Sequence, residues 1–400
     1  MNARLQKLHR YPFEKLNTLL ADSVTTTDQP ALSLGLGEPQ YPPPAFIAET
    51  LVKQLSGLSR YPVTKGLLSL RQAIADWLIK RYHLSEQSID PQQHVLPVNG
   101  TREALFSIAQ AVVDSDTRRS PLVIMTNPFY QIYEGGALLS GAEPYYLNTT
   151  KQTDYLPAFD SVPVSVWQRC QLIYVCSPNN PTGSVLPFEQ LSRLLELADR
   201  YDFVIASDEC YSEIYQDDNH PPMGLLQVAH QTGNTDYQHC LVFNSLSKRS
   251  SLPGLRSGFV AGNAEIIRQF YRYRTYHGCA MPLPLQYASI AAWQDEDHVL
   301  NNRNRYQQVI NDVYTVLNPV LSVDKPNGGF FLWPETPVND TEFARQLFID
   351  QAITVLPGQY LAREFEGVNP GLNRVRLALV HPHGQCLAAA HSIRDFITNL

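Results

Sequence analysis

Lys248 is the residue of this sequence best placed for covalent chemistry. It follows the apolar run Leu241–Phe243, with Ser245 and Ser247 just before it and Arg256 eight residues after it. Polar residues at the carboxyl ends of strands in an α/β sheet face a crevice, so this lysine is expected in a pocket. A partly desolvated lysine beside another cation has a lowered pKa and can form a Schiff base with a carbonyl group. The alternative for the isolated segment is an exposed lysine in a serine- and glycine-rich loop.

A second apolar run, Phe203–Ala206, leads to an acidic residue. Asp208 follows this run, and Tyr211 comes three residues later. A carboxylate at the end of a buried strand is costly unless a cation meets it, and the protonated pyridine nitrogen of a cofactor would do so. Alternatively, Asp208 caps the following helix or pairs with a structural arginine.

Two turns contribute further polar groups that could face the same crevice. Asn180 lies in a turn fixed by prolines and a glycine, and Gly100, Thr101 and Arg102 lead directly into a helical pattern. Backbone N–H groups at such a helix start can hold a phosphate, although a turn and a helix cap without a ligand are the plain alternatives. The second turn matches neither G-x-x-x-x-G-K-[ST] nor G-x-G-x-x-G, so the sequence does not indicate ATP hydrolysis or a dinucleotide site.

The elements that must position these residues alternate between short apolar runs and longer amphipathic stretches. Strands are predicted at Leu122–Met125, Leu172–Val175, Phe203–Ala206, Leu241–Phe243 and Gly258–Val260, and helices at Arg102–Val113, Phe188–Arg200 and Ala264–Tyr276. This alternation predicts an α/β fold with a mostly parallel sheet.

Two boundaries divide the predicted fold. They lie near the proline-rich segment Tyr41–Pro44 and within Asp295–Asn304. We therefore expect residues 1–45 to form an N-terminal arm and part of a small domain, 46–297 a large cofactor-binding domain, and 298–400 the rest of the small domain.

The composition argues against several classes of partner. The 31 Lys and Arg against 38 Asp and Glu give a net charge of −7 without basic runs, so neither nucleic acid nor anionic lipid is expected to bind. No apolar segment approaches the roughly 18 residues that span a membrane, and Met1–Lys7 does not resemble a signal peptide, so we expect a cytoplasmic protein. The six cysteines lack C-x-x-C spacing and the 11 histidines lack metal-ligand spacing, so no disulfide framework and no metal site are predicted.

The chemistry-bearing residues also occur in a characteristic order along the chain. That order is Gly100, Thr101, Arg102, Tyr130, Asn180, Asp208, Tyr211, Ser245, Ser247, Lys248, Arg256 and Arg376. The set resembles the class I/II aminotransferases of fold type I, which use pyridoxal 5′-phosphate. The resemblance implies a large domain with a mostly parallel sheet flanked by helices, a smaller α+β domain, and amino acids and oxo acids as substrates.

The resemblance also implies roles for the residues that meet the cofactor ring. Lys248 would form the Schiff base with the cofactor and move a proton during catalysis. Asp208 would hold the pyridine nitrogen protonated, and Asn180 and Tyr211 would hydrogen-bond the phenolic oxygen. Tyr130 would stack on the ring face. Lys248, Asp208 and Tyr211 are thus the expected catalytic residues.

Further roles concern the phosphate, the substrate and a second subunit. Gly100, Thr101, Arg102, Ser245, Ser247 and Arg256 would hold the phosphate, and Tyr61 would reach it from the neighbouring subunit of a homodimer with shared active sites. Arg376 would bind the substrate α-carboxylate together with Gly37 and Asn180. Taken singly, Tyr61 could instead be an ordinary interface or core residue, Gly37 a turn glycine, and Arg376 a helix-terminal or surface arginine.

A narrower resemblance concerns the substrate. The segments Tyr11–Leu16, Leu96–Phe106, Asn127–Gly135 and Tyr273–Pro282 resemble succinyldiaminopimelate aminotransferases of bacterial lysine biosynthesis. This implies amino transfer between glutamate and N-succinyl-2-amino-6-oxopimelate. Arg274, within Tyr271–His277, is a candidate for the distal anionic group, and a helix end at a dimer interface is the alternative for that segment. Alternatives are a transaminase for acetylornithine, aspartate or aromatic substrates, a pyridoxal-phosphate lyase, and a non-catalytic regulator. The regulator is disfavoured because no basic helix-turn-helix segment is evident.

Overall fold

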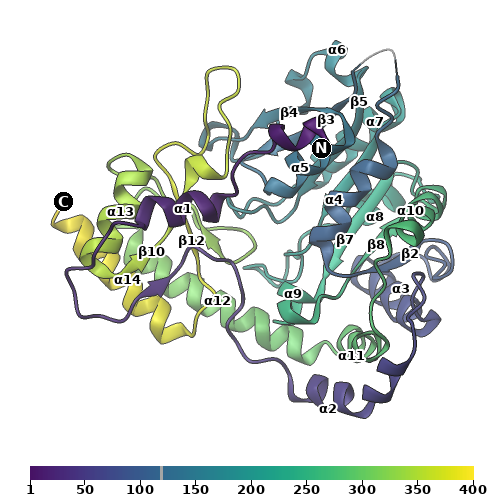
Figure 1. The fold of residues 1–400 in the computed structure, drawn as a ribbon, viewed down its shortest axis with the longest axis horizontal. Coiled ribbons are helices and arrows are strands. Elements are labelled where there is room, and N and C mark those ends of the chain that lie inside the picture. Colours follow the sequence, from purple (N-terminus) through teal and green to yellow (C-terminus); the bar gives the residue numbers. More distant parts are fainter. Residues whose placement is uncertain (118–119) are drawn as a thin grey trace.

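A seven-stranded sheet forms the centre of the molecule in the computed structural model, which describes residues 1–117 and 120–400 (Figure 1). The strand order is β2-β8-β7-β6-β5-β3-β4. The strands comprise β2 (Val95–Val98), β3 (Leu122–Asn127), β4 (Glu143–Asn148), β5 (Cys170–Cys176), β6 (Val204–Asp208), β7 (Cys240–Ser245) and β8 (Gly258–Gly262). All neighbouring pairs are parallel except those that include β8. The predicted mostly parallel α/β sheet is therefore confirmed.

The register of the parallel strands brings their carboxyl ends together. Cys176 of β5 pairs with Asp208 of β6, and Asp208 pairs in turn with Phe243 of β7. β5 and β7 are buried along nearly their whole length because helices cover both faces of the sheet. Residues that follow these strands therefore emerge at one edge, where a crevice can form.

Helices surround the sheet and connect its strands. They comprise α1 (Pro12–Leu20), α2 (Ala45–Lys53), α3 (Leu68–Tyr82), α4 (Thr101–Val112), α5 (Gln131–Ser140), α6 (Val164–Trp167), α7 (Phe188–Tyr201), α8 (Leu225–Gln231), α9 (Leu246–Arg249), α10 (Ala264–His277), α11 (Leu283–Gln294), α12 (Asp297–Leu317), α13 (Asp340–Gln351) and α14 (His383–Thr398). The 3-10 helices η1 (Ala3–Lys7), η2 (Leu55–Ser59), η3 (Lys151–Thr153), η4 (Phe159–Ser161), η5 (Pro253–Leu255) and η6 (Gly358–Tyr360) lie between them.

The predicted strands and helices are present, with ends that differ by one or two residues. Two strands of the seven-stranded sheet were not predicted, and both lie at its edges. β2 contains Pro97, which is tolerated there because an edge strand has one side without a partner. β4 is only partly buried, so its sequence lacks the continuous apolar run of a central strand.

A second, smaller group of elements combines both ends of the chain. β1 (Leu32–Ser33) pairs with β10 (Ile353–Thr354), and β9 (Phe331–Leu332), β12 (Val375–Ala378) and β11 (Leu356–Pro357) form an antiparallel sheet. α12 and α14 pack together beside them (Figure 1). The domain boundaries at residues 45 and 297 stay a prediction. Within the described ranges, no helix is both long and apolar enough to cross a bilayer.

Candidate active site

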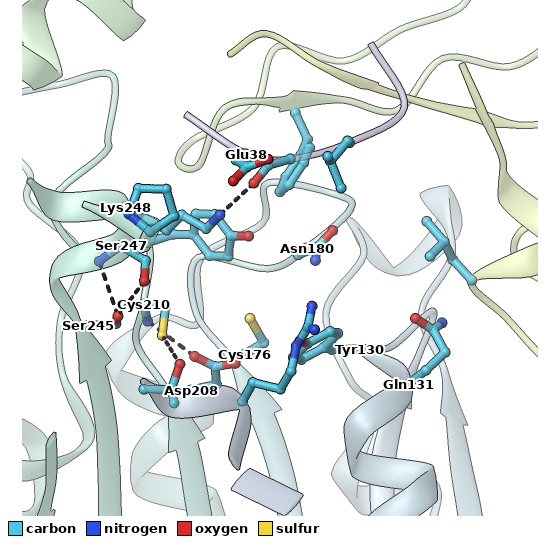
Figure 2. Close-up of a pocket in the computed structure, with 18 of the residues that line it drawn as sticks. Glu38, Tyr130, Gln131, Cys176, Asn180, Asp208, Cys210, Ser245, Ser247 and Lys248 are labelled. Carbon is cyan, nitrogen blue, oxygen red and sulfur yellow. Dashed lines mark hydrogen bonds between the residues drawn. The ribbon is translucent and has the colours of Figure 1, made fainter. Parts of the chain in front are cut away.

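A cavity of about 550 Å³ opens at the carboxyl ends of β5, β6 and β7 (Figure 2). Its volume lies in the range of small-molecule sites. Twelve of the fourteen residues predicted for the site line it: Gly37, Thr101, Arg102, Tyr130, Asn180, Asp208, Tyr211, Ser245, Ser247, Lys248, Arg256 and Arg376. The sequence therefore identified residues that the fold brings into one pocket.

Lys248 points from α9 across the pocket toward the segment that carries Glu38 (Figure 2). Its Nζ donates a hydrogen bond of 2.5 Å to the carbonyl of Gly37 and lies 5.4 Å from the ring centre of Phe330. Burial lowers the pKa of Lys248 to about 8, and the charge of Arg376 acts in the same direction. A neutral, nucleophilic amine is thus accessible near physiological pH.

Asp208 lies at the bottom of the pocket, where β6 ends. Its carboxylate accepts hydrogen bonds from the Tyr133 hydroxyl at 2.7 Å and from the Cys210 backbone N–H at 3.2 Å. Burial raises the pKa of Asp208, whereas the hydrogen bonds from Cys210 and Tyr133 and the charge of Lys248 lower it. This carboxylate is held in place by neutral donors.

The start of α4 and the segment around Arg256 form a cradle with several N–H and O–H donors. Gly100 has a φ of +80°, and a Cβ there would lie 2.1 Å from Nη2 of Arg256. Arg256 donates to the carbonyls of Pro253 at 2.8 Å and Asn99 at 3.3 Å. The glycine thus allows the Arg256 guanidinium to approach the N-terminus of α4. The positive charge of the guanidinium and the helix N-terminus both favour an anion there.

Two serines extend this cradle from the opposite side. The Ser245 hydroxyl donates to Oγ of Ser247 at 2.9 Å and accepts from its backbone N–H at 3.1 Å (Figure 2). Ser245 is therefore the N-cap of α9, the one-turn helix that carries Lys248.

Tyr130 and Tyr211 bring aromatic rings to the pocket. The Tyr130 hydroxyl accepts a hydrogen bond of 2.7 Å from Nε of Arg102. The Tyr211 ring packs against Phe330 and Phe331, with ring centres 5.4 and 5.6 Å away. Burial raises the pKa of both tyrosine hydroxyls, so both stay protonated and able to donate.

Arg376 provides a buried cation on β12. It donates to Oδ1 of Asn180 at 3.0 Å and to the carbonyl of Gly35 at 2.6 Å. Burial lowers the pKa of Arg376 to about 10. Its Nε–H has no acceptor within the described residues, which leaves one donor for a carboxylate from outside the chain.

Gly37 lies next to this arginine and tolerates no side chain. A Cβ at Gly37 would lie 2.9 Å from Cζ of Phe331, and the Phe331 ring centre lies 4.6 Å from the Arg376 guanidinium. The glycine thus lets the backbone approach the aromatic residue that supports Arg376.

The donor set of this pocket fits pyridoxal phosphate. Asp208 is buried and forms no ion pair with a cation in the described part of the chain, so a protonated pyridine nitrogen would supply the missing counter-charge. The cradle at Gly100, Thr101 and Arg256 matches a phosphate, and Lys248 lines the same pocket.

Two of the fourteen predicted residues lie outside the cavity lining, and so does Arg274, the candidate for the distal group. Gly100 packs against the Arg256 guanidinium, which lies in the lining in its place. The Tyr61 side chain is fully exposed and contacts no part of the pocket. Tyr61 is therefore no core residue of its own chain.

The expectation for Arg274 is wrong. This side chain is buried between α10 and α4, where it donates to both carboxylate oxygens of Glu103 at 2.5 and 2.7 Å. It does not line the cavity, because the buried ion pair turns its guanidinium away from it.

Other lining residues were not predicted from the sequence. Tyr11, Phe13, Leu36, Glu38 and Leu361 come from segments outside the large sheet, and no local pattern marks them. Tyr133, Cys176 and Cys210 lie beside Asp208. For Tyr133 a signal existed, since it lies one helical turn after Tyr130 in the same segment.

All six cysteines have free thiols. In the ranges 1–117 and 120–400, no three His, Cys, Asp or Glu side chains are grouped to hold a metal ion.

Comparisons with known proteins agree with this geometry. The family model for aminotransferase class I and II matches residues 29–393. An aminotransferase from Neisseria meningitidis Z2491 is 46% identical, with a TM-score of 0.94 over 99% of this chain and 100% of that one. The aminotransferase AspB from Helicobacter pylori 26695 is 34% identical, with a TM-score of 0.89 over 98% of this chain and all of the other.

A curated relative carries a more specific name. The LL-diaminopimelate aminotransferase of Nitratidesulfovibrio vulgaris (strain Miyazaki F) is 29% identical over 371 residues, which cover 91% of this chain and 92% of the relative. This enzyme differs from the succinyldiaminopimelate aminotransferases that the sequence resembles. The match over most of the chain, together with the pocket, shows that this protein belongs to the pyridoxal-phosphate-dependent class I and II aminotransferases.

Proposed function

We propose that this enzyme transfers an amino group reversibly between glutamate and N-succinyl-2-amino-6-oxopimelate. The products would be 2-oxoglutarate and N-succinyl-LL-2,6-diaminopimelate. One observation carries the underlying chemistry: Lys248, the unpaired Asp208 carboxylate and the Arg376 guanidinium line the same cavity. An amine, a counter-charge for a cofactor ring and a carboxylate-binding cation are the groups that amino transfer requires.

Each of these residues has a separate task in the proposed reaction. Bound pyridoxal phosphate supplies a carbonyl carbon and an electron-withdrawing ring. Lys248 would hold the cofactor and would carry the proton of the substrate α-carbon on its Nζ, for which a pKa near 8 is well matched. Asp208 keeps a positive charge at the ring nitrogen, and Arg376 orients the substrate through its α-carboxylate.

Asn180 and Tyr211 would contact the ring of the bound cofactor. Both line the cavity, and Oδ1 of Asn180 already accepts from Nη1 of Arg376 at 3.0 Å. We assign them hydrogen bonds to the phenolic oxygen, which would couple the position of the cofactor to the occupancy of the carboxylate site. Tyr130 is assigned to the ring face and the cradle at Gly100, Thr101, Arg102, Ser245, Ser247 and Arg256 to the phosphate.

The distal part of the substrate determines which amino acid is accepted. Three of the four segments that resemble succinyldiaminopimelate aminotransferases contribute to the cavity, through Tyr11, Phe13, Arg102, Gln131 and Tyr133. The phosphate assignment uses the backbone N–H of Arg102 at the start of α4, so its guanidinium remains for a distal anion, whereas Arg256 lies in the cradle and Arg376 is assigned to the α-carboxylate. Nε of Arg102 contacts a neutral hydroxyl, that of Tyr130, so a carboxylate would give it a charged partner.

LL-diaminopimelate is the second candidate, because curated relatives carry that name. The two substrates differ in distal charge: the free compound has an ammonium and a carboxylate there, whereas the succinylated compound has two carboxylates and no ammonium. Glu38, which also lines the cavity, is the group that a distal ammonium would pair with. We favour the succinylated substrate because the sequence resembles succinyldiaminopimelate aminotransferases and because Arg102 could pair with a distal carboxylate.

A panel of amino donors and oxo-acid acceptors tests this proposal. We expect the succinylated substrate to exceed aspartate, phenylalanine, acetylornithine and LL-diaminopimelate in kcat/KM by at least about a hundredfold, or roughly 2.7 kcal/mol. If the kcat/KM for LL-diaminopimelate is equal or higher, the substrate assignment is wrong, while the assignment to the aminotransferase class still holds. A product formed without any oxo-acid acceptor would instead identify a lyase.

We further propose a homodimer in which Tyr61 completes the partner's phosphate site. Apolar side chains around the exposed Tyr61 support this, since Leu55, Leu58, Val63 and Leu68 are each at least half exposed. Such a patch on one chain is typical of an interface with a second copy.

Hybrid dimers test this arrangement. Mixing inactive Tyr61→Ala and Lys248→Ala proteins should restore part of the activity, because one site of each hybrid contains both native residues. No recovery after verified subunit exchange would place Tyr61 outside the neighbouring site. The cytoplasm is part of the same proposal, and six free thiols suit a reducing compartment.

A further inference from the structure

The helix that carries Lys248 is only one turn long. α9 comprises Leu246–Arg249, and it ends because Ser251 adopts a left-handed backbone with a φ of +52°. A helix leaves its last carbonyl groups without partners inside the helix. In α9 these include the carbonyls of Lys248 and Arg249, so the backbone of the proposed catalytic lysine needs partners from elsewhere.

Asn302 of α12 supplies those partners. Its Nδ2 donates to the Lys248 carbonyl at 3.0 Å and to the Arg249 carbonyl at 3.1 Å, and its Oδ1 accepts from the Ser251 hydroxyl at 3.0 Å. Because carbonyls only accept, the orientation of this amide is determined. Asn302 is only 5% exposed, so water does not compete for these hydrogen bonds.

The residues after Lys248 are also attached to the α11–α12 junction. Arg249 is fully buried and donates to the Ala292 carbonyl at 2.8 Å and to the Glu296 carboxylate at 2.5 Å. The Ser250 hydroxyl lies 2.8 Å from Nε2 of His298. These contacts hold the side chains of α9 and its C-cap, whereas Asn302 donates to the main-chain carbonyl of Lys248 itself.

α12 extends from this contact toward the carboxylate site. One turn after Asn302, and hence on the same helix face, Tyr306 packs against Phe330 with ring centres 5.2 Å apart. Phe330 lies 5.4 Å from Nζ of Lys248, and its neighbour Phe331 lies under the Arg376 guanidinium. One face of one helix thus contacts both the lysine and the aromatic pair that supports the arginine.

We propose that Asn302 is a positioning residue that sets the place of Lys248 relative to Arg376 by capping α9 from α12. This inference rests on the role assigned to Lys248 above. The lysine Nζ must approach the reacting atoms to about 3 Å, and a misplacement of about 1 Å can cost a hundredfold in rate. The side chain at position 302 acts through two main-chain carbonyls and touches no substrate atom.

Two substitutions separate hydrogen bonding from packing. Asn302→Asp retains the volume but turns a carboxylate oxygen toward two carbonyl oxygens, whereas Asn302→Ala leaves the carbonyls without the donor but adds no repulsion. If Asn302 only fills space, the isosteric Asp should be the milder change. If it positions Lys248, Asp should be the more severe one.

The matched controls are Asn301→Asp and Asn301→Ala, which change an exposed residue of the same type on the same helix. The measurements are kcat and KM with glutamate and oxo acid, the thermal midpoint, and the pH midpoint of the visible cofactor absorbance of the holoenzyme. The charged or titratable groups that face the Lys248 amine, and that all these variants retain, are Glu38, Arg102, Asp208, Cys210 and Arg376.

We expect kcat to fall at least tenfold in Asn302→Ala and further in Asn302→Asp, with KM within about threefold of the unmodified enzyme. The pH midpoint of the absorbance should move in both variants and stay constant in the Asn301 pair. Equal kcat values in the Asn301 and Asn302 variants, or a milder effect of Asp than of Ala, would overturn the inference. If neither Asn302 variant folds, Asn302→Ser, which retains a short donor, is measured in the same way. We expect it to show an intermediate kcat. An unchanged kcat would overturn the inference.

Failure of the proposed function has a different signature. In that case the unmodified holoenzyme would show no visible absorbance that borohydride removes, and Lys248→Ala would leave its activity intact. The inference fails when the unmodified enzyme behaves as proposed and the Asn302 variants do not differ from their controls.

Discussion

The two walls of the pocket are built from different kinds of segment. The cofactor wall, here Asn180, Asp208, Ser245 and Lys248, consists of residues at or just after the ends of adjacent strands of one sheet. The substrate wall, here Tyr11, Gly37, Leu361 and Arg376, comes from both ends of the chain. A sheet edge suits a cofactor that is common to many enzymes, and separate segments can vary with the substrate. Substitutions in the cofactor wall should therefore affect all substrates alike.

Lys248→Ala should have the largest effect. We expect kcat to fall more than about a thousandfold for every amino donor, a barrier increase of roughly 4 kcal/mol, because nucleophile and proton carrier are lost together. The protein should still fold and bind cofactor, since the phosphate cradle is separate from the amine. Lys80→Ala, which changes an exposed lysine of α3, is the control. If the Lys248 variant kept its activity, Lys248 would not be the residue that holds the cofactor.

Asp208→Ala should come next. Without the counter-charge the ring nitrogen loses its proton, so we expect kcat/KM to fall about a hundredfold, or roughly 2.7 kcal/mol, for long and short substrates alike. Glu213 is unsuitable as a control because it is buried and paired with Arg81 at 2.6 Å, so the exposed Asp217 is changed to Ala instead. A loss below tenfold would mean that Asp208 has only a structural role.

Arg102→Gln tests whether a residue outside the two chain ends also contacts the substrate. We expect KM for the succinylated substrate to rise about tenfold, or roughly 1.4 kcal/mol, because a distal carboxylate loses a charged partner. KM for glutamate should change less than about threefold, and cofactor binding should remain because the backbone N–H groups are retained. Arg268→Gln on the exposed face of α10 is the control. Equal changes for both substrates would assign Arg102 to the cofactor wall instead.

Tyr133→Phe should have the smallest effect and change the pH dependence. The Tyr133 hydroxyl stabilises the ionised Asp208 and so lowers the pKa of this carboxyl group. Its removal should raise that pKa, so that Asp208 becomes protonated at a higher pH as the solution is acidified. The acid limb of the kcat/KM profile should therefore move to higher pH, with little change at pH 8. Tyr276→Phe, at an exposed tyrosine, is the control, and coincident acid limbs would exclude the hydroxyl from this role.

The same difference between the walls explains what the sequence could predict. Asp208 and Lys248 come directly after apolar runs, and parallel strands bring such residues to one edge, so a local pattern was sufficient. Leu361 and Tyr11 reach the pocket only through packing of distant segments, and nothing near them in the sequence indicates it. Arg274 was misassigned because helical spacing does not reveal that its partner, Glu103, lies 171 residues away.

The contacts of Gly35 and Gly37 bear on how the site forms during synthesis. Gly37 meets Lys248 across 211 residues of sequence, and Gly35 meets Arg376 across 341. Contacts of such separation form late, and a chain leaves the ribosome with its N-terminal part free to fold first. The cofactor wall is complete once Asn302, which caps α9, has emerged, whereas Arg376, the arginine proposed to bind substrate, arrives with the last strand, β12. A nascent chain can thus assemble the cofactor half of its pocket well before it can select a substrate.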